Sequence, residues 1–154
     1  MVRKQIGNFS SLLNKSKKVA VDTNVFIYQF SDHRRYSKLT NILFKLAEEK
    51  KLLLVTSIIT PIEVMSKPES ENRADLVSEY QKVFEQMPNL KVVPVDWQVA
   101  KLASRLRGSN KSLKIPDAIQ VASGLLMDCS LFITNDNHFK NIGELKIVLL
   151  SEYS

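Results

Sequence analysis

The sequence predicts an α/β fold with a mainly parallel sheet of four or five strands. Short apolar runs rich in β-branched residues alternate with longer stretches in which apolar residues recur at helical spacing. Strands and helices that alternate at these intervals are typical of βαβ units with right-handed crossovers. The chain has 154 residues, of which 44% are hydrophobic and 25% charged, so it can form one globular domain with a sizeable core.

Five apolar runs fit strands of a buried sheet. Each is short and continuous rather than alternating, as expected where helices cover both faces. The expected strands are 19–21, 52–55, 91–95, 131–134 and 146–150. Pro94 lies inside the third run. Because proline cannot donate a ladder hydrogen bond, we expect that strand near an edge of the sheet.

Helices are expected between the strands, where apolar residues form stripes. The expected helices are 25–30, 39–47, 57–66, 76–87, 97–108 and 116–126. Thr23 or Asn24 is a candidate cap for the first and Asp96 for the fifth, while Pro116 fits the first turn of the last. We expect a loop at 67–71, marked by Pro68.

Residues 1–18 form a basic N-terminal arm in this interpretation, and residues 19–154 form the single domain. The segment is polar, with a few scattered apolar residues. It fits either a short helix packed on the body or a frayed arm, and we expect a solvated terminus.

Composition restricts the class of protein. The net charge of +6 favours polyanionic partners, nucleic acid above all. Cys129 is the only cysteine, so no internal disulfide can form, and a reducing, cytoplasmic location is expected. We expect no membrane association, because no apolar run approaches the ~20 residues of a membrane span. The first 18 residues lack the apolar core of a signal peptide.

Four acidic residues follow strands or begin helices: Asp22, Glu63, Asp117 and Asp136. Each has an ordinary structural explanation. Asp22 can cap the helix after its strand, and Glu63 can complete a capping box with Thr60. Asp117 can interact with the positive end of its helix dipole, and Asp136 can form an Asx turn.

Taken together, the four acids favour a functional interpretation. Carboxyl ends of parallel strands meet at one edge of a sheet, which is where open α/β sheets bind ligands. Carboxylates gathered there repel one another and raise one another's pKa unless cations neutralise them. Oxygen ligands without a Cys or His cluster favour Mg²⁺ or Mn²⁺ over zinc.

The sequence resembles the PIN domain family, which includes the VapC-type toxins. The resemblance spans about residues 19–150 and rests on VAVDTNVFIY, on the acid in ITPIEV, and on KIPDAIQVASGLLMDCSLFITNDNHF. The last run is the most specific, because it joins an Asp-Ala-Ile helix to an apolar strand and a Thr-x-Asp ending.

The resemblance implies a three-layer α/β/α sandwich and an activity. In the family these positions hold metal-binding acids, which implies catalytic and metal-binding roles for Asp22, Glu63, Asp117 and Asp136. Asn24 and Thr134 match polar positions that orient the acids. The family further implies a metal-dependent endoribonuclease selective for single-stranded RNA, a homodimer, and, in toxins, an antitoxin partner.

Two features depart from the family pattern. His138 stands where many relatives have a further acid, and we expect it to be a surface or capping histidine rather than a catalytic base. Toxin members begin almost at the first strand, whereas 18 residues precede it here. The arm weakens the toxin assignment more than the nuclease assignment.

A nuclease of this kind needs basic residues that guide a polyanion past the acids. Two groups are candidates, and the sequence does not separate them. They are Arg34, Arg35 and Lys38, or Arg105, Arg107, Lys111 and Lys114.

Three other functions are consistent with parts of the sequence. A haloacid dehalogenase-type phosphatase requires a second Asp two positions after the first, where this chain has Asn24. A phosphoacceptor receiver domain requires an acidic pair after its first strand, which this chain lacks. A catalytically silent PIN fold that binds RNA or protein is the remaining alternative.

Overall fold

The computed structural model describes residues 1–154 and contains one parallel sheet. Its five strands lie in the order β3-β2-β1-β4-β5. Their bounds are β1 Lys18–Val21, β2 Leu53–Ser57, β3 Leu90–Val93, β4 Leu131–Thr134 and β5 Lys146–Leu149. The predicted α/β fold is confirmed. The third strand lies at an edge, as predicted, and ends directly before Pro94.

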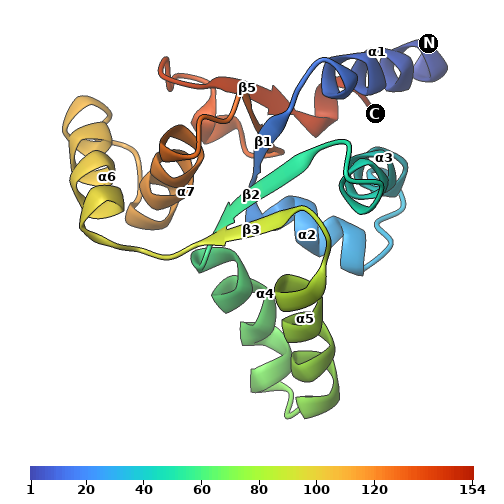
Figure 1. The fold of residues 1–154 in the computed structure, drawn as a ribbon, viewed down its shortest axis with the longest axis horizontal. Coiled ribbons are helices and arrows are strands. Elements are labelled where there is room, and N and C mark those ends of the chain that lie inside the picture. Colours follow the sequence, from blue (N-terminus) through green and yellow to red (C-terminus); the bar gives the residue numbers. More distant parts are fainter.

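Seven α-helices and two short 3₁₀ helices surround the sheet (Figure 1). They are α1 Val2–Asn14, α2 Thr23–Phe30, α3 Ser37–Glu48, α4 Ile59–Ser70, α5 Ala74–Gln86, α6 Trp97–Ser109, α7 Ile115–Leu126, η1 Asn137–Phe139 and η2 Leu150–Glu152. Helices α4 and α5 form a pair that projects from the end of β2 (Figure 1). None of the helices has the length and apolarity that a membrane crossing requires.

Two hydrophobic cores lie on opposite faces of the sheet. Successive residues of a strand point to opposite faces, so Val19 and Val21 join one core while Ala20 joins the other. The first core is completed by buried residues of α1, α2 and α3, such as Phe26. The second is completed by α6 and α7, with Val121 as an example. The three-layer arrangement therefore follows from strands that are apolar on both faces.

The N-terminal segment is a helix, and one of its faces packs on the first core. The prediction of a solvated terminus is therefore wrong for that face. Phe9 and Leu13 are 0% and 1% exposed. The Phe9 ring lies 5.4 Å from that of Tyr153, centroid to centroid. The basic residues of α1 remain on its exposed side, as an amphipathic helix requires.

The expected loop at 67–71 is also wrong, because α4 continues through Pro68 to Ser70. Proline lacks a backbone donor, so within a helix it removes one backbone hydrogen bond. Pro68 lies in the last turn of α4 and its side chain is buried, so packing offsets that loss.

Close packing of α7 on β1 yields a first prediction. A Cβ atom at Gly124 would lie 2.7 Å from Ala20 Cβ, which cannot move without displacing β1. Gly124→Ala should therefore lower the free energy of unfolding by about 1–2 kcal/mol, measured by urea denaturation, since overpacking outweighs the helix preference of alanine. Gly7→Ala in α1 is the control, because its Cβ would meet nothing within 4 Å. Equal stability of the two variants would contradict close packing at Gly124.

Candidate functional site

Asp22 lies directly after β1, the central strand, and is 8% exposed. It caps α2: the backbone N–H of Thr23 donates to Asp22 Oδ1 at 2.8 Å. The cap is therefore Asp22, and the expectation of Thr23 or Asn24 as cap is wrong. The other oxygen, Oδ2, accepts from the Thr134 hydroxyl at 2.7 Å. Asp22 thus fills its ordinary structural role while its carboxylate remains at the carboxyl edge of the sheet.

Glu63 lies in the second turn of α4, and its predicted capping box does not form. The helix begins at Ile59 without a side-chain cap, because Thr60 bonds to other side chains instead. Glu63 Oε1 accepts a hydrogen bond from Thr23 Oγ1 at 3.1 Å. Thr23 therefore connects Asp22, through its N–H, with Glu63, through its hydroxyl.

Asp117 and Asp136 approach the same edge from α7 and from the end of β4. Asp117 lies in the first turn of α7 and is half-buried. Asp136 caps η1, and its Oδ1 accepts from the His138 N–H at 2.9 Å, as the predicted Asx turn requires. Its own N–H donates to Thr134 Oγ1 at 3.1 Å, so Thr134 contacts both Asp22 and Asp136.

The electrostatics show that the four acids are neighbours. Burial, together with the charges of Asp117 and Glu63, raises the pKa of Asp22 to about 6, although the hydrogen bonds from Thr134 and Thr23 act to lower it. Burial also raises the pKa of Asp117, as do the charges of Asp136 and Glu63. The structure thus brings all four predicted acids to one edge of the sheet.

The supporting residues predicted at this edge also lie there. Asn24 Nδ2 lies 3.4 Å from both Asp22 Oδ2 and Thr134 Oγ1. Its side-chain oxygen, Oδ1, is buried and has no hydrogen-bond partner. Asn24 and Thr134 therefore contact the acid that the sequence placed at the centre of the site.

The oxygen atoms at this edge are of the kind that ligate a hard divalent cation. They are carboxylate, hydroxyl and amide oxygens, the ligands that Mg²⁺ and Mn²⁺ prefer. The unpartnered Asn24 Oδ1 adds an acceptor oxygen that no protein group satisfies. No group of three or more His, Cys, Asp or Glu side chains is arranged to hold a metal ion. The donor chemistry fits, whereas a preformed ligand cage is not present.

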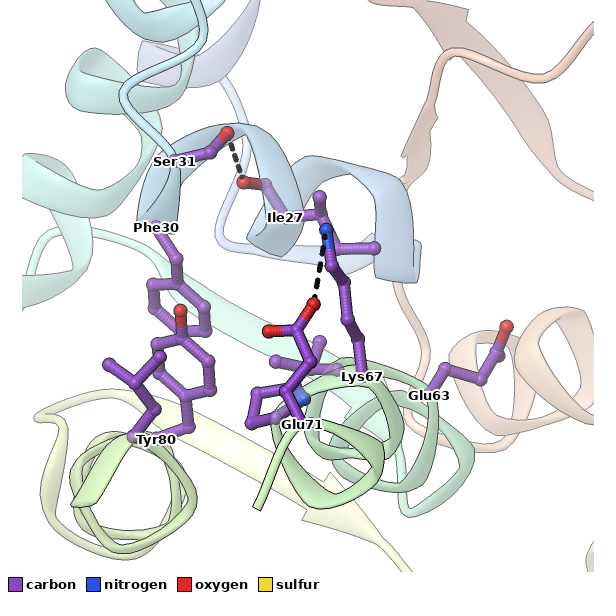
Figure 2. Close-up of a pocket in the computed structure, with 10 residues that line it drawn as sticks. Ile27, Phe30, Ser31, Glu63, Lys67, Glu71 and Tyr80 are labelled. Carbon is purple, nitrogen blue, oxygen red and sulfur yellow. Dashed lines mark hydrogen bonds and ion pairs between the residues drawn. The ribbon is translucent and has the colours of Figure 1, made fainter. Parts of the chain in front are cut away.

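A cavity of about 290 Å³ adjoins this edge and shares Glu63 with it. It is lined by α2, α4 and α5, with Ile27, Phe30 and Tyr80 among its residues. Figure 2 shows that the Glu63 side chain points away from the rings of Phe30 and Tyr80. Lys67 and Glu71 form an exposed ion pair within the cavity lining. The acidic edge, rather than the cavity, carries the chemistry of the site.

The residues around the acids include two further predicted features. His138 is exposed, and its Nδ1 lies 2.6 Å from Asp136 Oδ1, as expected for a surface histidine next to a cap. Of the two candidate basic groups, the second places Lys114 near the acids, where its charge offsets part of the rise in the pKa of Asp117. Arg107 instead donates to the Leu113 carbonyl, and Arg35 to Ser154.

Sequence reasoning missed a set of buried polar residues below the acids. Gln120, Thr56 and Thr60 are at most 2% exposed and bond to one another or to Thr23. A polar residue within an apolar helical stretch was the available signal, since Gln120 interrupts the stripe of α7.

The raised pKa of Asp22 predicts a pH dependence of stability in metal-free protein. In the unfolded chain this carboxyl titrates near 3.8, and in the folded chain near 6, so the folded protein holds the proton more tightly. Its contribution is complete below pH 3.8 and is lost as the pH rises through 6. The free energy of unfolding should fall by about 3 kcal/mol across this interval. Urea denaturation of wild type and Asp22→Asn checks this, and parallel pH profiles would contradict it.

The fold and the acidic edge define a class: an α/β/α protein whose central strand presents a buried carboxylate to a cluster of acids. The PIN domain family model matches residues 19–145. The chain therefore belongs to the PIN domain family, and the family resemblance seen in the sequence is confirmed. No curated protein matches the chain in sequence.

Solved structures share the fold at low sequence identity. VapBC2 from Rickettsia felis, bound to a DNA fragment from its promoter, matches with a TM-score of 0.68 and 17% identity, covering 86% of this chain and 98% of that one. A toxin–antitoxin complex from Klebsiella pneumoniae matches with a TM-score of 0.65 and 23% identity, covering 86% and 97%. FitAcB from Neisseria gonorrhoeae matches with a TM-score of 0.65 and 18% identity, covering 86% and 98%. These likenesses show that the chain shares the fold of these structures.

Proposed function

We propose that this chain is a VapC-like nuclease that uses Mg²⁺ or Mn²⁺ to cleave phosphodiester bonds in single-stranded or loop RNA. The observation that carries the proposal is the group of mutually repelling carboxylates at the carboxyl edge of the sheet. The pKa values of Asp22 and Asp117 are raised in part by the other acids, and such repulsion favours a bound cation. Membership of the PIN family supports a nuclease.

The four acids are proposed to have different roles, according to their burial and their contacts. Asp22 and Asp117 are the proposed main ligands, because both are at least half-buried and the charge of Asp117 contributes to the raised pKa of Asp22. Glu63 is more exposed and is held by Thr23, so it can bind through water or orient the attacking water. Asp136 completes the set from the end of β4. A divalent cation held here supplies charge stabilisation and activates a water.

Lys114 has a complementary role in this proposal. It is exposed, precedes α7 directly, and lies close enough to Asp117 to offset part of the rise in the pKa of that carboxyl. A cation at the rim of an acidic site attracts phosphate without entering the ligand set. The net charge of +6 acts in the same direction at longer range.

We further propose that the chain is the toxin of a toxin–antitoxin pair and forms a homodimer. The similar structures named above include toxin–antitoxin complexes. Co-expression with the product of an adjacent gene, followed by size-exclusion chromatography with light scattering, tests both points. A chain that stays monomeric and does not capture that product would contradict them.

One experiment tests the nuclease proposal against its rivals. Purified protein is titrated with Mg²⁺ and assayed with end-labelled single-stranded RNA, with duplex RNA and with p-nitrophenyl phosphate. We expect cleavage of single-stranded RNA only, and complete loss of cleavage with EDTA. Hydrolysis of p-nitrophenyl phosphate would favour a phosphatase. RNA binding without cleavage would favour the silent scaffold, the second candidate, which the lack of a preformed metal cage favours.

A further inference from the structure

Four polar side chains form a buried network directly below the acidic edge. Thr23, Thr56, Thr60 and Gln120 come from α2, β2, α4 and α7, and their exposed fractions lie between 0% and 6%. Buried hydroxyl and amide groups cost free energy unless their hydrogen bonds are satisfied. The way in which these bonds are satisfied determines where each proton points.

Two backbone groups fix the ends of the network. The Ser57 N–H donates to Gln120 Oε1 at 3.1 Å, so the amide oxygen faces β2 and the amide nitrogen faces the threonines. Gln120 Nε2 then donates to Thr60 Oγ1 at 2.6 Å and lies 3.4 Å from Thr23 Oγ1. At the other end, Thr56 Oγ1 donates to the Val21 carbonyl at 2.8 Å, since a carbonyl can only accept.

Counting protons then orders the hydroxyl groups. Each threonine hydroxyl can donate one hydrogen bond, and Thr56 already donates its bond to the Val21 carbonyl. The 2.7 Å contact between Thr56 and Thr60 therefore requires Thr60 to donate. Thr60 has no proton left for Thr23, which lies 3.1 Å away.

The Thr23 hydroxyl is therefore free to donate a hydrogen bond, and Glu63 is its acceptor. Thr23 Oγ1 accepts from Gln120 and lies 3.1 Å from Glu63 Oε1. A carboxylate is a stronger acceptor than a hydroxyl that already accepts from an amide. The Thr23 N–H meanwhile donates to Asp22 Oδ1 at 2.8 Å. Thr23 thus forms hydrogen bonds with both Asp22 and Glu63 and fixes their relative positions.

We propose that Gln120 is a positioning residue for the acidic site: by donating to Thr60 Oγ1 it occupies the hydroxyl that competes with Glu63 for the hydrogen of Thr23, so that the Thr23 hydroxyl donates to Glu63. The consequence for cation binding rests on the function proposed above. Groups that orient metal ligands through hydrogen bonds affect metal affinity without touching the metal.

Matched variants separate this role from a packing role. Gln120→Leu removes the donor and the acceptor, while Gln120→Glu keeps the acceptor for Ser57 and replaces the donor by a second acceptor. Thr23→Val removes the hydroxyl but leaves the backbone bond to Asp22, and Thr23→Ser restores the hydroxyl. Ser123→Ala is the control on α7, because Ser123 is 1% exposed and its hydroxyl bonds only to the Ile119 carbonyl, outside the network.

The first measurement uses metal-free protein. In wild type, the Thr23 hydroxyl proton should be observable by NMR, since it is hydrogen-bonded and protected from water, and it should correlate with the Glu63 carboxyl carbon. We expect this correlation to be lost in Gln120→Glu and Gln120→Leu and kept in Ser123→Ala. An unchanged correlation in both Gln120 variants overturns the inference.

The second measurement is the affinity for Mn²⁺, read from the EPR signal of the free ion without RNA. We expect binding to weaken about 10–100-fold in Gln120→Leu and Thr23→Val. Thr23→Ser should recover affinity relative to Thr23→Val, and Ser123→Ala should match wild type, with urea denaturation verifying that each variant folds. Equal affinities of wild type, Gln120→Leu and Thr23→Val overturn the inference.

The two measurements also separate this inference from the proposed function. If wild type binds no Mn²⁺ but its Thr23–Glu63 correlation still depends on Gln120, the positioning role stands and the metal-dependent function fails. If wild type binds Mn²⁺ and the correlation does not depend on Gln120, the function stands and the positioning role fails.

Discussion

Asp22→Asn should reduce magnesium-dependent cleavage of single-stranded RNA by about 1,000-fold or more, because a metal supplies several kcal/mol of charge stabilisation and an amide is a poor ligand for it. The variant keeps the geometry of the edge, since Asn Oδ1 can still accept from the Thr23 N–H. Cleavage rates at saturating RNA and Mg²⁺ measure the effect.

The same substitution should not destabilise the metal-free protein. Asp22 is buried and its pKa is raised to about 6, so at pH 8 the folded chain carries an unfavourable charge that asparagine removes. We expect a gain of about 1–2 kcal/mol in the free energy of unfolding, since part of the benefit is offset by the altered bond to Thr134.

A matched control exists for this variant. Asp96 caps α6 by accepting from the Val99 N–H at 2.9 Å, and asparagine is an equally good cap. Asp96→Asn should therefore leave both cleavage and stability unchanged. Retained cleavage in Asp22→Asn, or equal loss in the two variants, would contradict a role for Asp22 as a metal ligand.

Phe9→Ala should lower the free energy of unfolding by about 3–4 kcal/mol, although it lies outside the residues matched by the family model. The side chain is fully buried and packs on the Tyr153 ring, so its removal leaves a cavity between α1 and the C-terminal segment. Urea denaturation measures the change.

Ser11→Ala is the control for Phe9→Ala, since Ser11 lies on the exposed side of the same helix. It should change stability by less than about 0.5 kcal/mol. A loss below about 1 kcal/mol for Phe9→Ala would show that α1 is a loosely attached arm rather than part of the core.

The sequence predicts the sheet and its acidic edge because both depend on local patterns. Continuous apolar strands require helices on both faces, and parallel strands require their carboxyl ends to share an edge. Asp22 follows the first strand directly, so its place at that edge needed no knowledge of packing. Thr134 and Asp136 could be predicted at this edge for the same reason, because they lie at the end of β4.

Other features depend on tertiary contacts that no local pattern contains. The buried Phe9 ring packs against Tyr153, which is remote in sequence. Thr60 does not cap α4 because Gln120 and Thr56, from other elements, bind its hydroxyl. The link between Thr23 and Glu63 depends on how α2 and α4 are rotated about their axes, which spacing alone does not give.

Crystals grown with Mn²⁺ and measured at the manganese absorption edge test the central claim most directly. We predict an anomalous peak within coordination distance of Asp22 and Asp117 that disappears in Asp22→Asn. A peak elsewhere on the chain, or none at this edge at millimolar Mn²⁺, would contradict it.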